Sequence, residues 1–242
     1  MQMRSVKTKI HLAASRLHKW FALIVGLQVL IWMTSGLVMS VLPIEVVRGE
    51  HLVNRTGHEV LGKVQGVRPL EDVVAAAQGP VEAVTFRIQG GRLTAEVTGG
   101  GKSALVDPYT ANRLPPIGKD AAAAIALRSW KGTANPSVAV EQVEGTSPEF
   151  RGPLPAWRVT LDGSTHVYVG ADTGQVRAVR TDTWRIYDFL WGLHIMDWKE
   201  HDNFNNVWLV SFAASGLLFA LTGFMLLIMR FPLKLRRRRS AI

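Results

Sequence analysis

Two long stretches without a charged residue constrain the fold of this chain more than any other feature. They cover residues 20–44 and 207–229, which are 25 and 23 residues free of Lys, Arg, Asp and Glu. About 20 apolar residues in a helix are enough to cross the hydrocarbon core of a bilayer. We therefore expect two transmembrane helices, at residues 20–44 and 207–229.

The distribution of charge predicts which side of the membrane each part faces. Of 28 Lys and Arg residues, 11 lie before residue 20 or after residue 229, whereas all 19 Asp and Glu residues lie between the two stretches. The segment between them thus holds 28 − 11 = 17 basic and 19 acidic residues, a net charge of −2. The positive-inside rule then places both termini in the cytoplasm and the central segment on the opposite side. The formal net charge of +9 therefore indicates contact with lipid headgroups, and no nucleic-acid partner is expected.

The first stretch begins close to the N-terminus, so a cleaved signal peptide is the alternative to an anchor. Its apolar part is longer than that of a signal peptide, and no A-x-A-like cleavage site precedes Pro43. A retained anchor is therefore expected. The chain has no cysteine, which excludes disulfide bonds, thiolate chemistry and covalent attachment of c-type haem.

The segment between the spans shows the same order of elements twice, a helix followed by a meander of strands. The apolar spacing predicts helices at residues 70–78 and 120–130, and strands at 83–88, 93–97, 104–106, 137–143, 156–161, 165–169 and 175–179. Glycines at Gly90-Gly91, Gly99-Gly100-Gly101 and Gly163 supply hairpin turns. The prediction is an α+β domain of two small antiparallel sheets, each carrying a helix. Residues 144–155, with three prolines, are expected to form an exposed loop.

These patterns divide the chain into seven predicted segments. They are a basic cytoplasmic leader at 1–19, a first span at 20–44, a first helix-and-meander unit at 45–115, a second such unit at 116–182, an aromatic segment at the membrane interface at 183–206, a second span at 207–229 and a basic cytoplasmic tail at 230–242.

Several short sequences in this arrangement resemble a known family. Trp157–Leu161, His166–Val169 and Asp172–Val176 resemble the core of a PepSY domain. Arg16–Trp20 before a span that contains Ser35-Gly36, and Leu193-His194 before a span that contains Leu221–Phe224, resemble the first and last helices of the PepSY-associated transmembrane family. The resemblance covers residues 16 to about 230. It implies a bacterial inner-membrane protein with a double PepSY-like domain in the periplasm.

The resemblance implies two possible functions. Some members of the family are linked to iron and siderophore uptake, and larger members with four spans are similar to haem-containing ferric reductases. This chain has only two spans, so it would serve iron-linked or haem-dependent redox as a homodimer or as an accessory subunit of a membrane complex. Isolated PepSY domains bind or inhibit peptidases, which makes a non-catalytic periplasmic binding module the alternative. Whether the protein is an enzyme stays open.

Histidines at the ends of the spans are the candidate cofactor ligands. His194 and His18 are candidate ligands of haem b, but the first span rises roughly 37 Å and separates them, so a dimer would have to supply each ligand twice. If residues 191–201 are helical, His194, Asp197 and His201 lie on one face, and a metal ion could use Asp197 with either histidine. The alternative is that His194 belongs to an aromatic belt at the membrane interface.

Other chemical motifs are missing or lie in the wrong place. The histidine spacings match no zinc signature, and the chain has no G-x-S-x-G sequence and no dinucleotide-binding fingerprint. Gly99–Ser103 superficially resembles part of a phosphate loop but lacks the required spacing and lies between predicted strands. A hairpin turn is expected there. His166, which alternates with Tyr168 on one strand face, is expected to be exposed or to belong to a partner surface.

Overall fold

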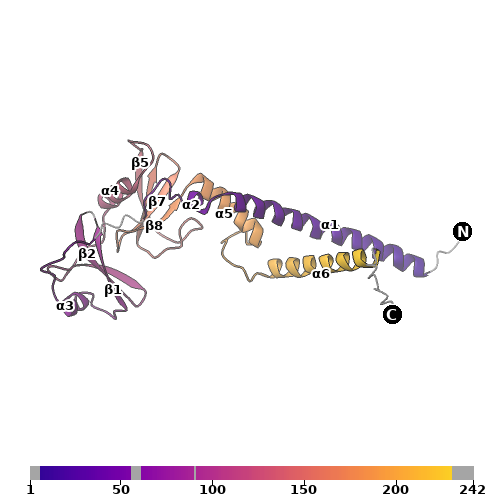
Figure 1. The fold of residues 1–242 in the computed structure, drawn as a ribbon, viewed down its shortest axis with the longest axis horizontal. Coiled ribbons are helices and arrows are strands. Elements are labelled where there is room, and N and C mark those ends of the chain that lie inside the picture. Colours follow the sequence, from indigo (N-terminus) through magenta and orange to yellow (C-terminus); the bar gives the residue numbers. More distant parts are fainter. Residues whose placement is uncertain (1–5, 56–60, 90, 231–242) are drawn as a thin grey trace, which may run out of the picture. The chain divides into compact units, whose positions relative to one another are not determined.

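The computed structural model describes residues 6–55, 61–89 and 91–230, with side chains from residue 19 to residue 225. The chain forms two compact units (Figure 1). One, the sheet unit, comprises residues 42–188. The other, the helical unit, combines the chain up to residue 41 with the chain from residue 189 onward. Each is described separately.

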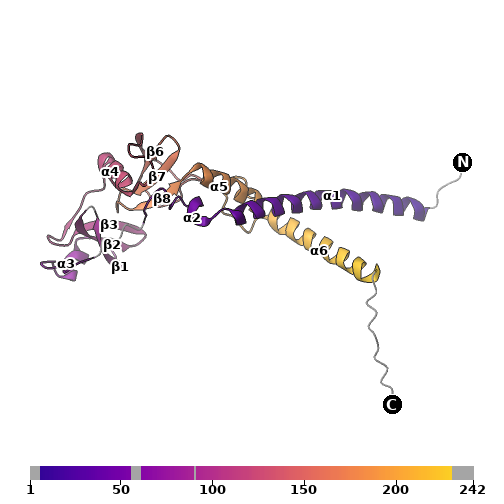
Figure 2. The ribbon, with the colours of Figure 1, turned by 45° about the horizontal axis from the view of Figure 1, so that its top comes forward.

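The helical unit contains two helices long and apolar enough to cross a membrane. They are α1 (Val6–Val41) and α6 (Val207–Arg230), and their apolar parts span Lys19–Val41 and Val207–Met225. The two helices pack against each other and diverge toward their far ends (Figure 2). Most of their Leu, Ile, Val and Met side chains are exposed on the outside, as expected for surfaces that face lipid.

The first apolar helix ends earlier than the uncharged stretch suggests. The prediction placed the end of the span at residue 44, whereas α1 ends at Val41 and a separate helix, α2 (Ile44–Val47), follows. Pro43 explains the difference. Its ring removes a backbone donor and disfavours helical geometry at Leu42, so α1 ends there and Pro43 is the N-cap of α2.

The first half of the sheet unit is a four-stranded antiparallel sheet with one short helix. The helix is α3 (Leu70–Ala75), and the strands are β1 (Ala83–Gln89), β2 (Arg92–Gly99), β3 (Lys102–Asp107) and β4 (Asn112–Arg113). The strands lie in the order β1-β2-β3-β4. Val73 of α3 packs with Ala95, Val97 and Val106 to form the core of this half. The two-residue strand β4 is too short for the sequence pattern to predict.

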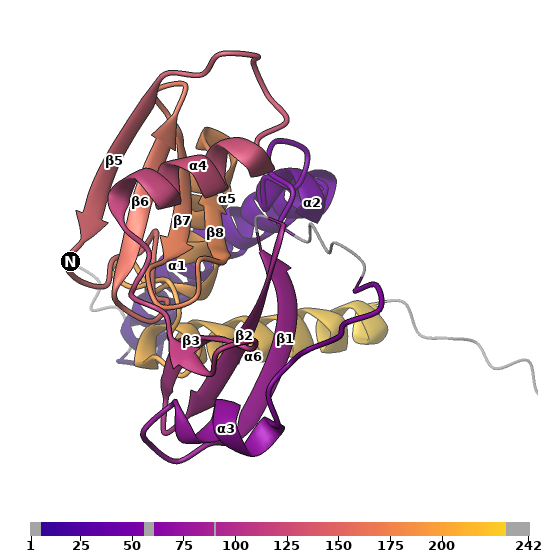
Figure 3. The same ribbon diagram turned by 90° about the vertical axis from the view of Figure 1, so that its left-hand side faces the viewer.

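The second half repeats this plan. The helix α4 (Lys119–Ser129) precedes the strands β5 (Val138–Val143), β6 (Ala156–Leu161), β7 (Thr165–Gly170) and β8 (Val176–Arg180). They form an antiparallel sheet in the order β5-β6-β7-β8, and α4 lies across one face of it (Figure 3). Ala122 and Ala126 of α4 pack on Val159, Leu161 and Val167. Two apolar helices that flank two antiparallel sheets confirm the predicted membrane α+β architecture at this level.

Candidate functional site

The helix α5 (Asp182–Ile195) brings His194 against α1 within the helical unit. The His194 Nδ1 atom lies 3.0 Å from the hydroxyl oxygen of Ser35, and that hydroxyl lies 2.8 Å from the carbonyl oxygen of Ile31. A hydroxyl has one proton, and here it is donated to the carbonyl of Ile31. When the hydroxyl donates in this way, the Ser35 oxygen accepts a hydrogen bond from Nδ1–H, and the tautomer with this proton on Nδ1 has its lone pair on Nε2. The described residues offer His194 Nε2 no hydrogen-bond partner.

Gly36 allows the imidazole to lie close to the backbone of α1. A Cβ atom built at Gly36 would be 3.5 Å from Cε1 and 3.9 Å from Nδ1 of His194. These are ordinary contact distances, so an alanine fits at this position and a larger side chain does not. The resemblance singled out Ser35-Gly36 and His194 separately, and the structure brings them together.

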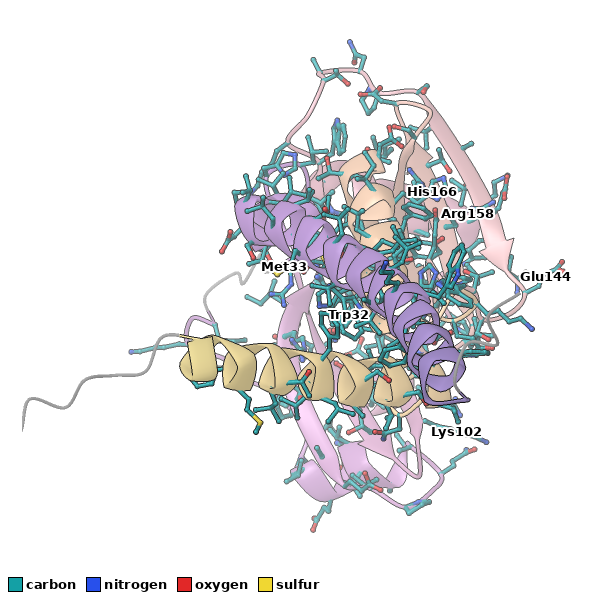
Figure 4. All side chains as sticks on the ribbon, turned by 90° about the vertical axis from the view of Figure 1, so that its right-hand side faces the viewer. Trp32, Met33, Lys102, Glu144, Arg158 and His166 are labelled. Atoms are coloured by element: carbon teal, nitrogen blue, oxygen red, sulfur yellow. The ribbon has the colours of Figure 1, made fainter. Side chains whose placement is uncertain are left out.

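The same face of α1 carries two further polar groups. Gln28, Trp32 and Ser35 are spaced by four and three residues and thus share one side of the helix. Trp32 lies on the side of α1 that faces α6 (Figure 4). The Nε2 atom of Gln28 and the Nε1 atom of Trp32 are buried without a hydrogen-bond partner in the part of the chain that the structure describes. A buried donor without an acceptor costs about 1–3 kcal/mol, so these two groups lower the stability of this part of the chain.

Asp197 and His201 do not share a helical face with His194. The helix α5 ends at Ile195, and Met196 has a φ of 55°, so the assumption of one helix through residue 201 is wrong. The Asp197 carboxylate causes the change of direction, because it accepts backbone hydrogen bonds of 3.0–3.3 Å from residues 199, 200, 202 and 203. These bonds lower the pKa of Asp197 to about 2.

The positions of the other two predicted histidine ligands, His201 and His18, follow from their own elements. The ring of His201 lies against Gly192, where a Cβ atom would be 2.5 Å from Cδ2 of the imidazole. His18 belongs to α1, but its side chain lies outside the described residues; its position is 35 − 18 = 17 residues from Ser35, a rise of about 26 Å. Among residues with described side chains, no three His, Asp or Glu residues gather in a way that could hold a metal ion.

A second cluster of polar side chains, which we call the Glu149 clamp, lies in the sheet unit. Its members are Glu149, His166, Tyr168 and Arg185. The carboxylate of Glu149 accepts hydrogen bonds from His166 Nδ1 at 2.6 Å, from the Tyr168 hydroxyl at 3.0 Å and from Arg185 Nε at 2.7 Å. Phe150, which is buried, stacks on the ring of Tyr168 with 4.6 Å between ring centroids.

The clamp corrects one expectation from the sequence and adds to another. Only 19% of the His166 side chain is exposed, so the expectation of an exposed histidine is wrong. The loop at residues 144–155 is mostly exposed, as expected, but Glu149 and Phe150 hold it on the sheet. No local pattern reveals the clamp, because Glu149 and His166 are 17 residues apart and belong to different elements.

The charged and polar groups of the clamp form hydrogen bonds with one another. Burial raises the pKa of the Glu149 carboxyl, but hydrogen bonds from His166, Arg185 and Tyr168 together hold it below its ordinary value. Burial and the nearby Glu149 charge raise the pKa of Tyr168 to about 12, so its phenol stays protonated and donates. All three donors converge on one carboxylate and none is aimed at open space. The clamp is therefore suited to holding the loop and not to catalysis.

Comparison with known proteins agrees with the architecture. A family model described as the PepSY-associated TM region matches residues 15–241, which include both apolar helices and both sheets. No curated protein and no solved structure matches the chain. The resemblance noted in the sequence is thus confirmed over nearly the whole chain, and this chain belongs to the family of membrane proteins with a PepSY-associated TM region.

Proposed function

We propose that this protein is an inner-membrane haem-binding protein of an iron- or siderophore-linked redox system, with His194 as a ligand of haem b. The excess of Lys and Arg in the two terminal segments supports cytoplasmic termini and a periplasmic sheet unit. The redox chemistry would be one-electron transfer, which haem supplies when it is bound.

The hydrogen bond between Ser35 and His194 carries this proposal. Histidines that bind a metal through one ring nitrogen commonly donate the other N–H to an acceptor, which fixes the tautomer and the orientation of the ring. His194 has this arrangement, with Nδ1 on the Ser35 hydroxyl and Nε2 without a partner among the described residues. The residues would therefore fit one haem ligand per chain.

A homodimer would complete the site, because His18 and His194 of one chain are too far apart to share one haem. A two-fold axis brings two copies of the same residue together, so a dimer can present a pair of His194 side chains. The spans leave room for such contact. The glycines of α6, Gly216 and Gly223, have no atom within 4 Å of the place where a Cβ would stand, and small residues at such spacing let helices approach closely.

An absorbance spectrum of the detergent-solubilised protein tests the proposal. Wild-type protein should show a haem Soret band, and His194→Ala should lose it because the axial nitrogen is gone. The control is His166→Ala, which removes a histidine from the sheet unit and should keep the wild-type haem content. Haem retained in full by His194→Ala would refute the assignment of His194.

A non-catalytic periplasmic binding module is the second candidate, and the order of the sheets favours it. The strands β1 and β5 are at the edges of their sheets, and most of the side chains of β5 are exposed. An exposed edge strand can add an extended peptide segment of a partner such as a peptidase or a membrane complex. Colourless protein that co-purifies with another subunit, cross-linked through β1 or β5, would support this function over haem binding.

A further inference from the structure

The first sheet carries a pocket that neither candidate function uses. It has a volume of about 360 Å³ and lies between the segment that follows α3 and the hairpin that joins β2 to β3. The pocket exists because α3 is only six residues long and leaves the end of the sheet uncovered. The chain then turns at Gln78, whose φ is 55°, and returns along the sheet at Pro80.

One wall of the pocket is fixed by close packing of backbone on backbone. A Cβ atom at Gly99 would lie 1.8 Å from the carbonyl oxygen of Pro80, so only glycine permits this approach. The backbone N–H of Glu82 donates to the Thr98 carbonyl at 2.8 Å, and the Glu82 carboxylate accepts the N–H of Gly100 at 3.2 Å. The pocket is therefore built before any ligand arrives, which lowers the entropy cost of binding.

The lining of the pocket is positively charged. It includes Lys102 from β3 and Arg113 from β4, and it includes no Asp or Glu. Other basic side chains of this sheet are paired, as Arg92 is with Asp107 at 2.9 Å. The described residues provide no ion-pair partner for Lys102 or Arg113. Glu82 lies next to the hairpin, and its carboxylate accepts a hydrogen bond from the backbone N–H of Gly100.

The remaining lining residues define the kind of anion that fits. Gln78 and Ser103 add polar groups, whereas Ala77, Val97 and Ala104 provide an apolar floor. Arg binds carboxylates through two parallel N–H donors, and Lys adds a point charge. A volume of this size lies at the small end of the range for ligand pockets. The floor favours an organic ligand over a bare inorganic ion.

We propose that this pocket binds a small organic dicarboxylate, with Lys102 and Arg113 as the residues that recognise its charges. Both cations are exposed, so the ligand has access from solvent and its affinity falls as salt is raised. The site is independent of His194 and of the edges of the sheets.

Isothermal titration of the full chain in detergent with succinate tests this inference. Inorganic phosphate and the uncharged analogue succinamide serve as comparison ligands. Succinate should bind in a saturable way, and at least ten-fold more tightly than either comparison ligand. Lys102→Gln and Arg113→Gln should each weaken succinate binding about ten-fold or more, which corresponds to about 1.4 kcal/mol. Lys63→Gln is the matched control, because it removes the same charge from an exposed position outside the pocket and should bind as the wild type does.

Three results would overturn the inference. They are no succinate binding by the wild type, equal binding of succinate and succinamide, and unchanged binding by both pocket variants. Phosphate that binds as tightly as succinate would show a general anion site and would also contradict the organic class of ligand. Unchanged unfolding temperatures of the two variants would show that any loss of binding is not a loss of fold.

Discussion

Replacing Glu149 by glutamine should release the loop that the Glu149 clamp holds on the sheet. The carboxylate accepts three hydrogen bonds, and hydrogen bonds to a charged group each contribute about 1.5–3 kcal/mol. Glutamine keeps one acceptor oxygen for Arg185 or Tyr168 but turns a donor toward His166. Because 24% of the Glu149 side chain is exposed, solvent replaces part of what is lost. We expect a loss of about 2–3 kcal/mol, which lowers the unfolding temperature of the sheet unit by roughly 4–12 °C.

The assay compares Glu149→Gln with Glu144→Gln, which makes the same chemical change at an exposed position of the same loop (Figure 4). Thermal unfolding followed by near-ultraviolet circular dichroism gives the stability, and limited trypsin digestion at Arg151 reports release of the loop. The folded-state pKa of Glu149 lies below its ordinary value of 4.5. Its stabilisation is therefore complete above about pH 4.5 and is lost as the pH falls through the folded-state pKa. Equal unfolding temperatures and equal digestion of the two variants would refute the clamp.

Three further predictions concern other sites. Tyr168 should ionise near pH 12 in an ultraviolet titration and the corresponding step should vanish in Tyr168→Phe, since burial and Glu149 oppose the phenolate; a variant that instead loses a step near pH 10 would contradict this. Gly99→Ala should destabilise the sheet unit by more than about 2 kcal/mol in chemical unfolding, because the new methyl group meets the Pro80 carbonyl, whereas Gly79→Ala has open space and should be neutral. Asp197→Asn should speed proteolysis of the segment after α5, because four backbone N–H groups lose a charged acceptor; unchanged cleavage would count against that role.

Sequence patterns predict the spans and strands because each depends on neighbouring residues. Uncharged length predicts a transmembrane helix, and alternation in residues such as Trp157–Leu161 predicts a strand with one buried face. The ends of helices are harder to predict, because single side chains decide them. Pro43 ends the first span early, and Asp197 gathers backbone donors and so prevents α5 from continuing to His201.

The candidate sites depend on residues that are distant in the sequence. Ser35 and His194 are 159 residues apart and meet only because α5 packs on α1. Glu149 comes from a loop that looks exposed by composition, and its partners come from β7 and α5. Lys102 and Arg113 line one pocket only because of the hairpin and the two-residue strand β4, which no periodic pattern marks. Local spacing carries no information on such contacts.

The two buried donors on α1 affect the stability of the membrane part. Gln28 Nε2 and Trp32 Nε1 leave the lone chain roughly 2–6 kcal/mol less stable than a chain with both donors satisfied. A lipid chain or a docking helix cannot reach these two atoms, because the chain itself covers them. Gln28→Leu together with Trp32→Phe should thus raise the unfolding temperature of the detergent-solubilised protein. The membrane helices therefore keep two polar groups at a cost in stability that contact with lipid does not recover.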